Sequence, residues 1–169
     1  VAAAQVALPK TKFGGSFNSV PKVTRAILIT CVSIFAVSLL LGSFSFTYGM
    51  IPEAIAQGQW WRLLTSTVLH GGILHLLFNM YALYWLGPQL ERSLGHVRFA
   101  ALYILSALGG SVASYWFSDV RTVSVGASGA IFGLITATIV IGRETRTDVS
   151  QLIVLLGINA ATSLSKVEM

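Results

Sequence analysis

The sequence predicts an all-α polytopic membrane protein, and three observations support this fold class. Hydrophobic residues make up 54% of the 169 residues, whereas charged residues make up only 10%. Because soluble domains carry about 25% charged residues, a chain this apolar is not expected to stay soluble as one globular domain. Apolar runs long enough to cross a bilayer recur between short polar connectors. Cys31 is the only cysteine, which excludes intrachain disulfides and CxxC metal sites.

The N-terminal third of the chain predicts a tail, one span and an interfacial connector. Residues 1–23 are small, polar and basic, and they predict a flexible tail. The first span is predicted at Ala26 to Phe46, an almost purely apolar run. The connector from Thr47 to Thr67 is amphipathic, and its Trp60-Trp61-Arg62 run is typical of the membrane–water interface. A transmembrane domain is therefore predicted over residues 24–164.

The second predicted span, Leu69 to Leu86, carries polar residues that are costly inside a bilayer. Gly71-Gly72 interrupts this run near its start. Gly87-Pro88 is predicted to end it, because proline cannot continue the hydrogen-bond ladder of a helix. The polar residues are His70, His75 and Asn79.

A polar connector, Gln89 to Arg98, separates the second span from the third. The third span is predicted at Phe99 to Phe117, and its Gly109-Gly110 pair favours close packing against another helix. The connector carries Glu91, Arg92, Gly95 and His96.

The fourth predicted span, Ser128 to Ile141, is short and has small residues, Gly129 and Gly133, at four-residue spacing. Such a helix is expected to be central and surrounded by other helices. A charged connector, Arg143 to Asp148, precedes a fifth and marginal span at Val149 to Leu164.

Lysine and arginine placement predicts the topology. With the N-terminus inside, eight of these residues fall on the inner side of the membrane and three fall outside. This asymmetry accounts for the net charge of +5 without a nucleic-acid partner. The second and fourth spans then run from outside to inside, so His75, Asn79 and Ser128 are expected at similar depth in the outer half. The inner residues are Lys10, Lys12, Lys22, Arg25, Arg92, Arg98, Arg143 and Arg146, and the outer ones are Arg62, Arg121 and Lys166.

Gly126-Ala127-Ser128-Gly129 places a serine at the predicted start of the fourth span. Free N–H groups at a helix N-terminus stabilise an anion, which is what acyl transfer needs beside a nucleophilic hydroxyl. The alternative for this stretch is close helix packing. His75 and Asn79 share one helix face, and the alternative for them is an interhelical hydrogen-bond pair. Taken together, they are candidate donors to an oxyanion formed at Ser128.

The order of the motifs is more specific than any one of them. His70-x4-His75-x3-Asn79 is followed by Gly126-x-Ser128-Gly129, and this combination resembles the signature of the rhomboid intramembrane serine proteases. The resemblance covers roughly Ala26 to Leu164. Supporting matches are Trp61-Arg62, Glu91-Arg92 with Gly95, and Gly109-Gly110.

The resemblance implies a rhomboid-like bundle of six helices around a short fourth helix, of which five spans are present here. It implies a Ser–His dyad with Ser128 as nucleophile, and no metal or cofactor. His75, Asn79 and the Ser128 amide would form the oxyanion hole, and Gly126 would shape the loop leading into it. Phe132 lies one turn after Ser128, where the family places an aromatic ring against the catalytic imidazole.

Other matched residues are implied to be structural. Trp61-Arg62 would fix the first connector, and Glu91 with Arg92 would brace the inner connector. The implied partners are single-span membrane proteins, cleaved near the outer membrane boundary, and the lipid bilayer. Multi-pass insertion in a bacterial inner membrane is the expected location, with the N-terminus cytoplasmic.

One departure from the family pattern concerns the general base. The family places this histidine on a sixth helix, and none of the three histidines here corresponds to it. The chain as given is therefore expected to be inactive, as a partial sequence of an active protease whose truncation falls at residues 165–169. Two alternatives stay open: an inactive rhomboid-like protein that binds membrane clients, and an unrelated transporter or channel.

Overall fold

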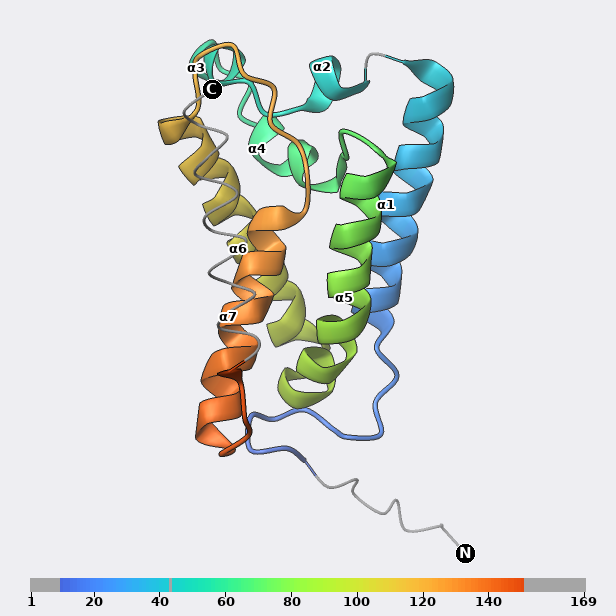
Figure 1. Ribbon diagram of the computed structural model, residues 1–169, viewed down its shortest axis with the longest axis vertical. Helices are drawn as coiled ribbons and strands as arrows, with labels where there is room; N and C mark the ends of the chain where they lie inside the picture. The colour runs from blue at the N-terminus through green and yellow to red at the C-terminus, as the bar shows by residue number, and fades with distance from the viewer. Residues whose placement is uncertain (1–9, 43, 151–169) are drawn as a thin grey trace, which may run out of the picture.

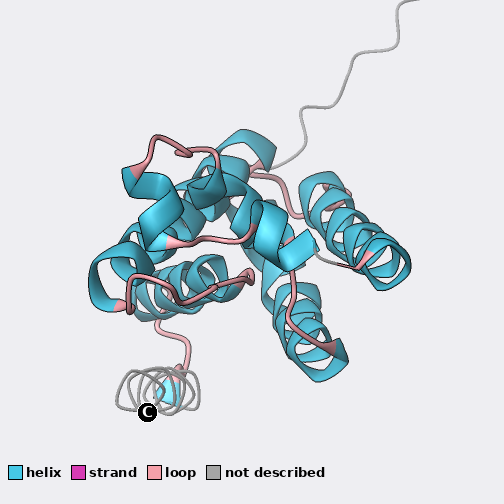
Figure 2. Cartoon of the chain, turned by 90° about the horizontal axis from the view of Figure 1, so that it is seen from above, coloured by secondary structure: helices cyan, strands magenta, loops and turns pink. Residues whose placement is uncertain are grey.

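Four long helices lie side by side in a computed structural model that describes residues 10–42 and 44–150 (Figure 1). Figure 2 shows the same helices from above. Within these ranges the structure has no strand beyond two isolated bridges, Lys10–Ser16 and Met50–Ser124. The elements are α1 (Lys22–Leu41), α2 (Phe44–Tyr48), α3 (Pro52–Ala56), α4 (Arg62–Thr65), η1 (Ser66–Val68), α5 (Ile73–Leu94), α6 (His96–Phe117) and α7 (Ser128–Glu144).

Helical membrane architecture is confirmed. Among the described residues, two helices, α1 and α6, are long and apolar enough to cross a membrane on their own. A third span results if α4–η1 and α5, which meet at 89°, are taken together as one bent unit. At 17 residues α7 is shorter, as predicted for the fourth span. Most of the predicted fifth span, from residue 151 onward, lies outside the described residues.

The bundle has two distinct ends (Figure 1). At the end that we call the basic end, α1 and α6 begin and α5 and α7 finish. At the opposite loop end lie the short helices α2, α3 and α4 with the segment 118–127. The lysines and arginines that the sequence assigned to the inner side all lie in the elements that meet at the basic end, so these charges are segregated as predicted.

Two predicted span boundaries are wrong at the loop end. The first span stops at Leu41 instead of Phe46, because Gly42 adopts φ 64, and residues 44–48 form the separate helix α2. The second span begins at Ile73 instead of Leu69. Residues 69–72 instead form the bend before α5.

The prediction that Gly87-Pro88 ends a helix is also wrong, because α5 continues to Leu94. Pro88 has no N–H to donate to the carbonyl of Tyr84, which costs one helical hydrogen bond. Burial of Leu90 and Glu91 beyond the proline offsets that loss. Gly87 has its own role, since a Cβ there would lie 2.7 Å from Thr24 Cγ2 of α1. The residue pair therefore brings α1 and α5 close together without breaking α5.

The core lies between α5, α6 and α7. Gly110 of α6 and Gly129 of α7 meet so closely that a Cβ on Gly110 would lie 2.6 Å from Gly129 Cα. Gly109 faces open space, so only one member of the predicted Gly109-Gly110 pair makes the contact. Within the described residues α7 buries one face, with Ala130, Leu134 and Ile135, whereas Thr136 and Val140 are exposed, so its central position stays a prediction. The fully or nearly fully buried core residues include Leu83, Leu86, Leu90, Phe99, Leu134 and Ile135.

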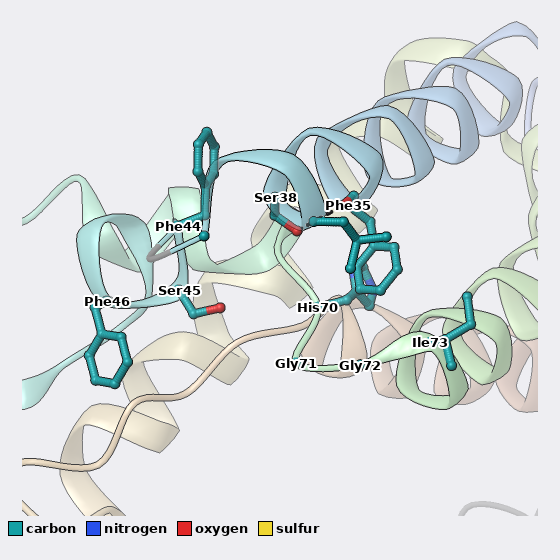
Figure 3. Close-up of a pocket in the computed structure, with 11 residues that line it drawn as sticks. Phe35, Ser38, Phe44, Ser45, Phe46, His70, Gly71, Gly72 and Ile73 are labelled. Atoms are coloured by element: carbon teal, nitrogen blue, oxygen red, sulfur yellow. Dashed lines mark hydrogen bonds between the residues drawn. The ribbon is translucent and has the colours of Figure 1, made fainter.

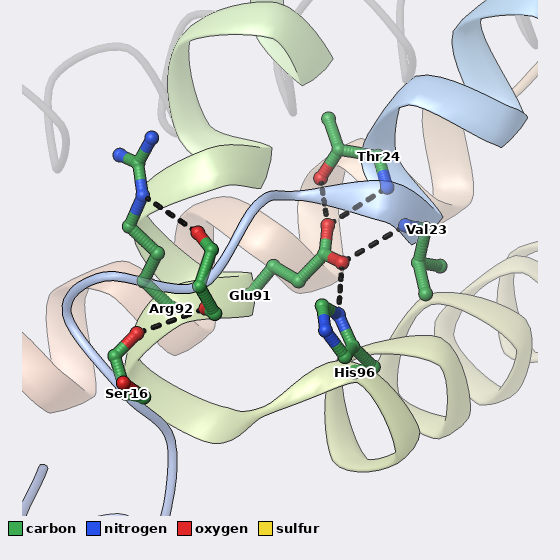
Figure 4. Close-up of polar contacts among 7 residues, drawn as sticks. Ser16, Val23, Thr24, Glu91, Arg92 and His96 are labelled. Atoms are coloured by element: carbon green, nitrogen blue, oxygen red, sulfur yellow. Dashed lines mark hydrogen bonds and ion pairs between the residues drawn. The ribbon is translucent and has the colours of Figure 1, made fainter. Parts of the chain in front are cut away.

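Glu91 holds the basic end together (Figure 4). Its side chain is 0% exposed, and its carboxylate accepts the backbone N–H groups of Val23 at 2.9 Å and Thr24 at 2.8 Å. The Thr24 hydroxyl donates at 2.6 Å, and His96 Nδ1 lies 2.5 Å from the second carboxylate oxygen. One side chain of α5 therefore caps α1 and contacts the first residue of α6.

The described part of the N-terminal tail lies against the same end. Gly15 N–H donates to the Ser93 carbonyl at 3.0 Å, and the Thr11 hydroxyl donates to the same carbonyl at 2.5 Å. Lys12 forms an ion pair of 2.9 Å with Glu144 at the end of α7. These contacts connect residues 10–21 to the α5–α6 corner and to α7.

Candidate active site

Ser128 is the first residue of α7 and is exposed to a cavity of about 240 Å³. Its position at the helix N-terminus was predicted, and it leaves the N–H groups of the first turn without intrahelical acceptors. Ala127, directly before it, is 0% exposed and anchors the helix start in the core. The cavity is also lined by the serines Ser66, Ser111 and Ser114, by Gly126 and Gly129, and by the aromatic ring of Phe132.

Backbone hydrogen bonds hold the loop that leads to Ser128. Met50 and Ser124 exchange both of their backbone hydrogen bonds, at 3.0 and 2.9 Å. Glu53 N–H donates to the Val120 carbonyl at 3.0 Å. Gly126 N–H donates to the Ser66 carbonyl at 2.9 Å. The first connector therefore sets the path of the chain just before the serine.

Gly126 brings His75 to this loop. Its φ is +127°, a region that residues with a Cβ rarely adopt. A Cβ on Gly126 would lie 2.6 Å from His75 Cε1 and 2.7 Å from His75 Nε2, so the imidazole lies directly against the glycine. One residue, Ala127, separates Gly126 from Ser128 along the chain. The imidazole of α5 and the serine of α7 thus belong to one region of the structure.

Asn79 is buried one turn after His75 on α5. Its side-chain Nδ2 donates to the His75 carbonyl at 2.8 Å, which fixes the amide along the helix. An amide nitrogen carries two hydrogens, so this bond leaves one donor for another acceptor. The lining of the Ser128 cavity, within the described chain, includes Phe132 but neither His75 nor Asn79.

The His70 ring packs against the His75 ring. His70 is 5% exposed, and the two rings meet edge-on, with centroids 5.3 Å apart and an interplanar angle of 63°. The second-span polar residues therefore form a row leading from the bend before α5 into the bundle. His70 contributes to a different cavity from the one at Ser128.

Arg62 organises the first connector. Its side chain is buried, and its guanidinium donates to the carbonyls of Phe46 at 3.0 Å and Gly49 at 2.8 Å. Its Nε donates to Gln59 Oε1 at 2.6 Å. Trp61, in contrast, is 54% exposed. Arg62 thereby fixes the strand-like stretch around Met50 that pairs with Ser124.

Glu91 and Arg92 lie at the basic end (Figure 4), and Gly95 follows them at the end of α5. Arg92 Nε donates to the Ser19 carbonyl at 3.4 Å, and Gly95 separates α5 from α6 with φ 82°. His96 is also at this end, on Glu91. These residues stabilise the helix ends and contact no group at the serine.

Sequence reasoning missed the residues that position the serine loop through their backbones. Met50, Ser66 and Ser124 do so with N–H and C=O groups that every residue type except proline offers. The residue types at these three positions therefore gave no indication of this role. Gln59, which accepts from Arg62, was likewise not singled out in the amphipathic connector.

A bundle of apolar helices with a serine at the start of α7 defines a polytopic membrane protein with a candidate hydrolase site. A family model of the Rhomboid domain matches residues 57–166, well over half of the chain. The chain belongs to the rhomboid family, a family of intramembrane proteases, and the resemblance inferred from the motifs is confirmed.

Individual relatives agree with this assignment. The chain is 46% identical over 143 residues to "Rhomboid protease GluP" of Bacillus subtilis (strain 168), covering 81% of this chain and 28% of the relative. Identity to "Putative rhomboid protease YdcA" of the same organism is 48% over 80 residues, or 47% and 40% of the two chains. "RHOMBOID-like protein 4" of Arabidopsis thaliana is 44% identical over 101 residues, or 57% and 25%. The chain thus spans between a quarter and two fifths of these relatives.

Proposed function

We propose that this chain forms most of the active site of an intramembrane serine endopeptidase. Ser128 is the nucleophile, and the substrates are single-span membrane proteins cleaved near the outer membrane boundary. The observation that carries the proposal is the contact of Gly126 with the His75 imidazole, immediately before the serine that begins α7. The enzyme works in a bilayer, proposed to be a bacterial inner membrane with the basic end and the N-terminus cytoplasmic.

The geometry supports a division of roles among the residues at the loop end. Attack of Ser128 Oγ on a peptide carbonyl turns the carbonyl oxygen into an oxyanion. His75, the second hydrogen of Asn79 Nδ2 and the Ser128 N–H are the proposed donors to that oxyanion. Phe132, which lines the same cavity, gives the catalytic imidazole an aromatic surface to pack on.

The general base is proposed to be a histidine that these 169 residues do not contain. His96 is bonded to Glu91 at the basic end, and His75 is assigned to the oxyanion. His70 packs on His75 and lines another cavity. The base accepts the Ser128 proton during attack and returns it to the leaving amine, after which water hydrolyses the acyl-enzyme. On this proposal the chain as given lacks activity.

Labelling with a fluorophosphonate probe tests the nucleophile. The full-length protein that contains this sequence is reconstituted in vesicles, and Ser128→Ala is compared with Ser114→Ala, which removes a hydroxyl from the same cavity. Labelling and cleavage of a single-span substrate are expected to vanish in Ser128→Ala and to persist in Ser114→Ala. Labelling that survives Ser128→Ala would exclude this assignment. Stable substrate binding without labelling would instead favour an inactive client-binding protein.

A further inference from the structure

The basic end carries more positive charge than its own contacts use. Among the described residues, eight cationic and three acidic side chains lie in the tail, helix ends and connectors at this end. Two of the acidic side chains are already engaged, since Glu91 is buried against α1 and Glu144 pairs with Lys12. The third, Asp148, accepts hydrogen bonds from Ser150. This end therefore offers cations to a partner outside the bundle. All of the cationic residues except Arg92 are exposed, and they are Lys10, Lys12, Lys22, Arg25, Arg92, Arg98, Arg143 and Arg146.

Three of these cations occupy positions that their own helices disfavour. Lys22 and Arg25 lie among the first four residues of α1, and Arg98 is the third residue of α6. The positive end of the helix dipole lies at the N-terminus, so it repels a cation there. The Glu91 carboxylate accepts N–H groups of α1, but neither Lys22 nor Arg25 forms an ion pair with any described residue. An anion from outside the bundle would offset this repulsion.

Exposed apolar side chains lie beside these cations in the chain. The tail forms a turn that is closed by the N–H and the hydroxyl of Ser19, which donate to the Ser16 carbonyl at 3.1 and 2.8 Å. Phe17, at the tip of this turn, is 65% exposed, and Val20 is 48% exposed. Val97 of α6 is 82% exposed. Apolar residues mixed with lysine and arginine are typical of a surface that enters the membrane interface.

Backbone contacts fix the tail at the depth of the lipid headgroups. The tail runs across the ends of the helices at the basic end and leads into α1, a helix long enough to cross the bilayer (Figure 1). The Gly15 N–H donates to the Ser93 carbonyl, and a Cβ on Gly15 would overlap the Arg92 carbonyl. The headgroup region begins where a membrane-spanning helix leaves the hydrocarbon core. The turn that carries Phe17 is therefore held at the interface.

We propose that this surface binds anionic phospholipids of the adjacent leaflet. Phe17 and Val20 enter the leaflet, and Lys22, Arg25 and Arg98 bind the headgroup phosphates. A soluble anion fits less well, because it would leave the apolar side chains in water. The cavity at the loop end offers no equivalent, since no lysine or arginine stands among its described lining residues (Figure 3). The inference rests on insertion of the bundle in a membrane and not on the serine site.

Native mass spectrometry of the full-length protein tests the preference for anionic lipid. The delipidated protein is offered phosphatidylglycerol and phosphatidylcholine with identical acyl chains. The wild type should retain phosphatidylglycerol better, and its retention should fall about 5-fold in each of Lys22→Gln and Arg25→Gln. Arg121→Gln makes the same change at an exposed arginine of the loop end and should leave retention unchanged. Equal retention of the two lipids by the wild type, or equal falls in Arg25→Gln and Arg121→Gln, would overturn the proposal.

Hydrogen exchange in nanodiscs keeps the test informative if those variants fail to fold, because it starts from the wild type. Amides of residues 16–20 should exchange more slowly in discs that contain phosphatidylglycerol than in discs of phosphatidylcholine alone, whereas residues 118–122 should exchange equally in both. Phe17→Ser should lose this protection, and Phe117→Ser, at a similarly exposed phenylalanine of α6, should keep it. Protection that is independent of phosphatidylglycerol, or that rises with protein concentration as contact with a second copy would, contradicts the lipid surface.

Discussion

The two ends of the bundle are held by different kinds of interaction. At the basic end, one buried carboxylate, Glu91, accepts hydrogen bonds from the start of α1 and lies against His96 of α6. At the loop end, backbone pairs such as Met50 with Ser124 and Gly126 with Ser66 hold the chain. The difference teaches that the scaffold end depends chiefly on the side chain of Glu91, whereas the site end combines the Arg62 side chain with backbone pairs and with the missing Cβ at Gly126. Four variants test this contrast.

The largest effect is expected from Glu91→Ala. It removes the acceptor for two backbone N–H groups and one hydroxyl, so the free energy of unfolding should fall by at least about 3 kcal/mol, since bonds to charged groups contribute most. Denaturant unfolding in micelles, followed by circular dichroism, measures it. Glu144→Ala is the control, because its ion pair with Lys12 is exposed. Equal losses in the two variants would contradict a special role for Glu91.

Gly126→Ala should have the next largest effect, and it acts at the loop end. The added Cβ meets the His75 ring and forces alanine to adopt φ +127°, which costs about 1–3 kcal/mol. Displacement of one proposed oxyanion donor should also slow probe labelling of Ser128 about 100-fold. Gly109→Ala, where nothing lies within 4 Å, is the control for both readouts. A lowered free energy of unfolding with unchanged labelling would remove His75 from the proposed site.

A smaller effect is expected from Arg62→Lys. Lysine keeps the charge but lacks the planar fork that reaches the Phe46 and Gly49 carbonyls and Gln59 together. The unfolding free energy should fall by about 1–2 kcal/mol. Protease accessibility of residues 44–60 should rise more than that of the basic end, which limited proteolysis can measure. An equal rise in protease cleavage at the loop end and at the basic end would argue against a local role for Arg62.

The smallest effect is expected from Lys12→Ala. Both partners of the Lys12–Glu144 pair are more than half exposed, with side-chain exposures of 65% and 58%. Such pairs contribute less than about 1 kcal/mol, and salt screens them. The melting temperature of Lys12→Ala should match that of the wild type at high salt. A drop comparable to Glu91→Ala would show that the tail contributes more to the basic end than its contacts indicate.

Prediction from sequence succeeded for elements whose position is decided by hydrophobicity or by the chemistry of a few neighbouring residues. The apolar runs at α1 and α6 and the start of a short helix at Ser128 follow from burial and from glycine and serine chemistry. It failed at Pro88, because the local rule for proline ignores the burial of Leu90 and Glu91 beyond it. It could not separate Gly109 from Gly110, since only the rotation of α6 against α7 distinguishes them.

The amino-acid sequence alone was enough to predict that the protein is helical and membrane-embedded. It also contained the family motifs and the residues of the candidate serine site. Hydrophobicity, charge asymmetry and ordered motifs are properties of the chain itself, so they can be read without coordinates. Three features required the folded molecule: the approach of His75 to Gly126, the backbone hydrogen bonds of Met50 and Ser66 to the serine loop, and the cavity lined by His70. These features arise from backbone hydrogen bonds and from distances between helices far apart in the chain, which leave no signature in residue type.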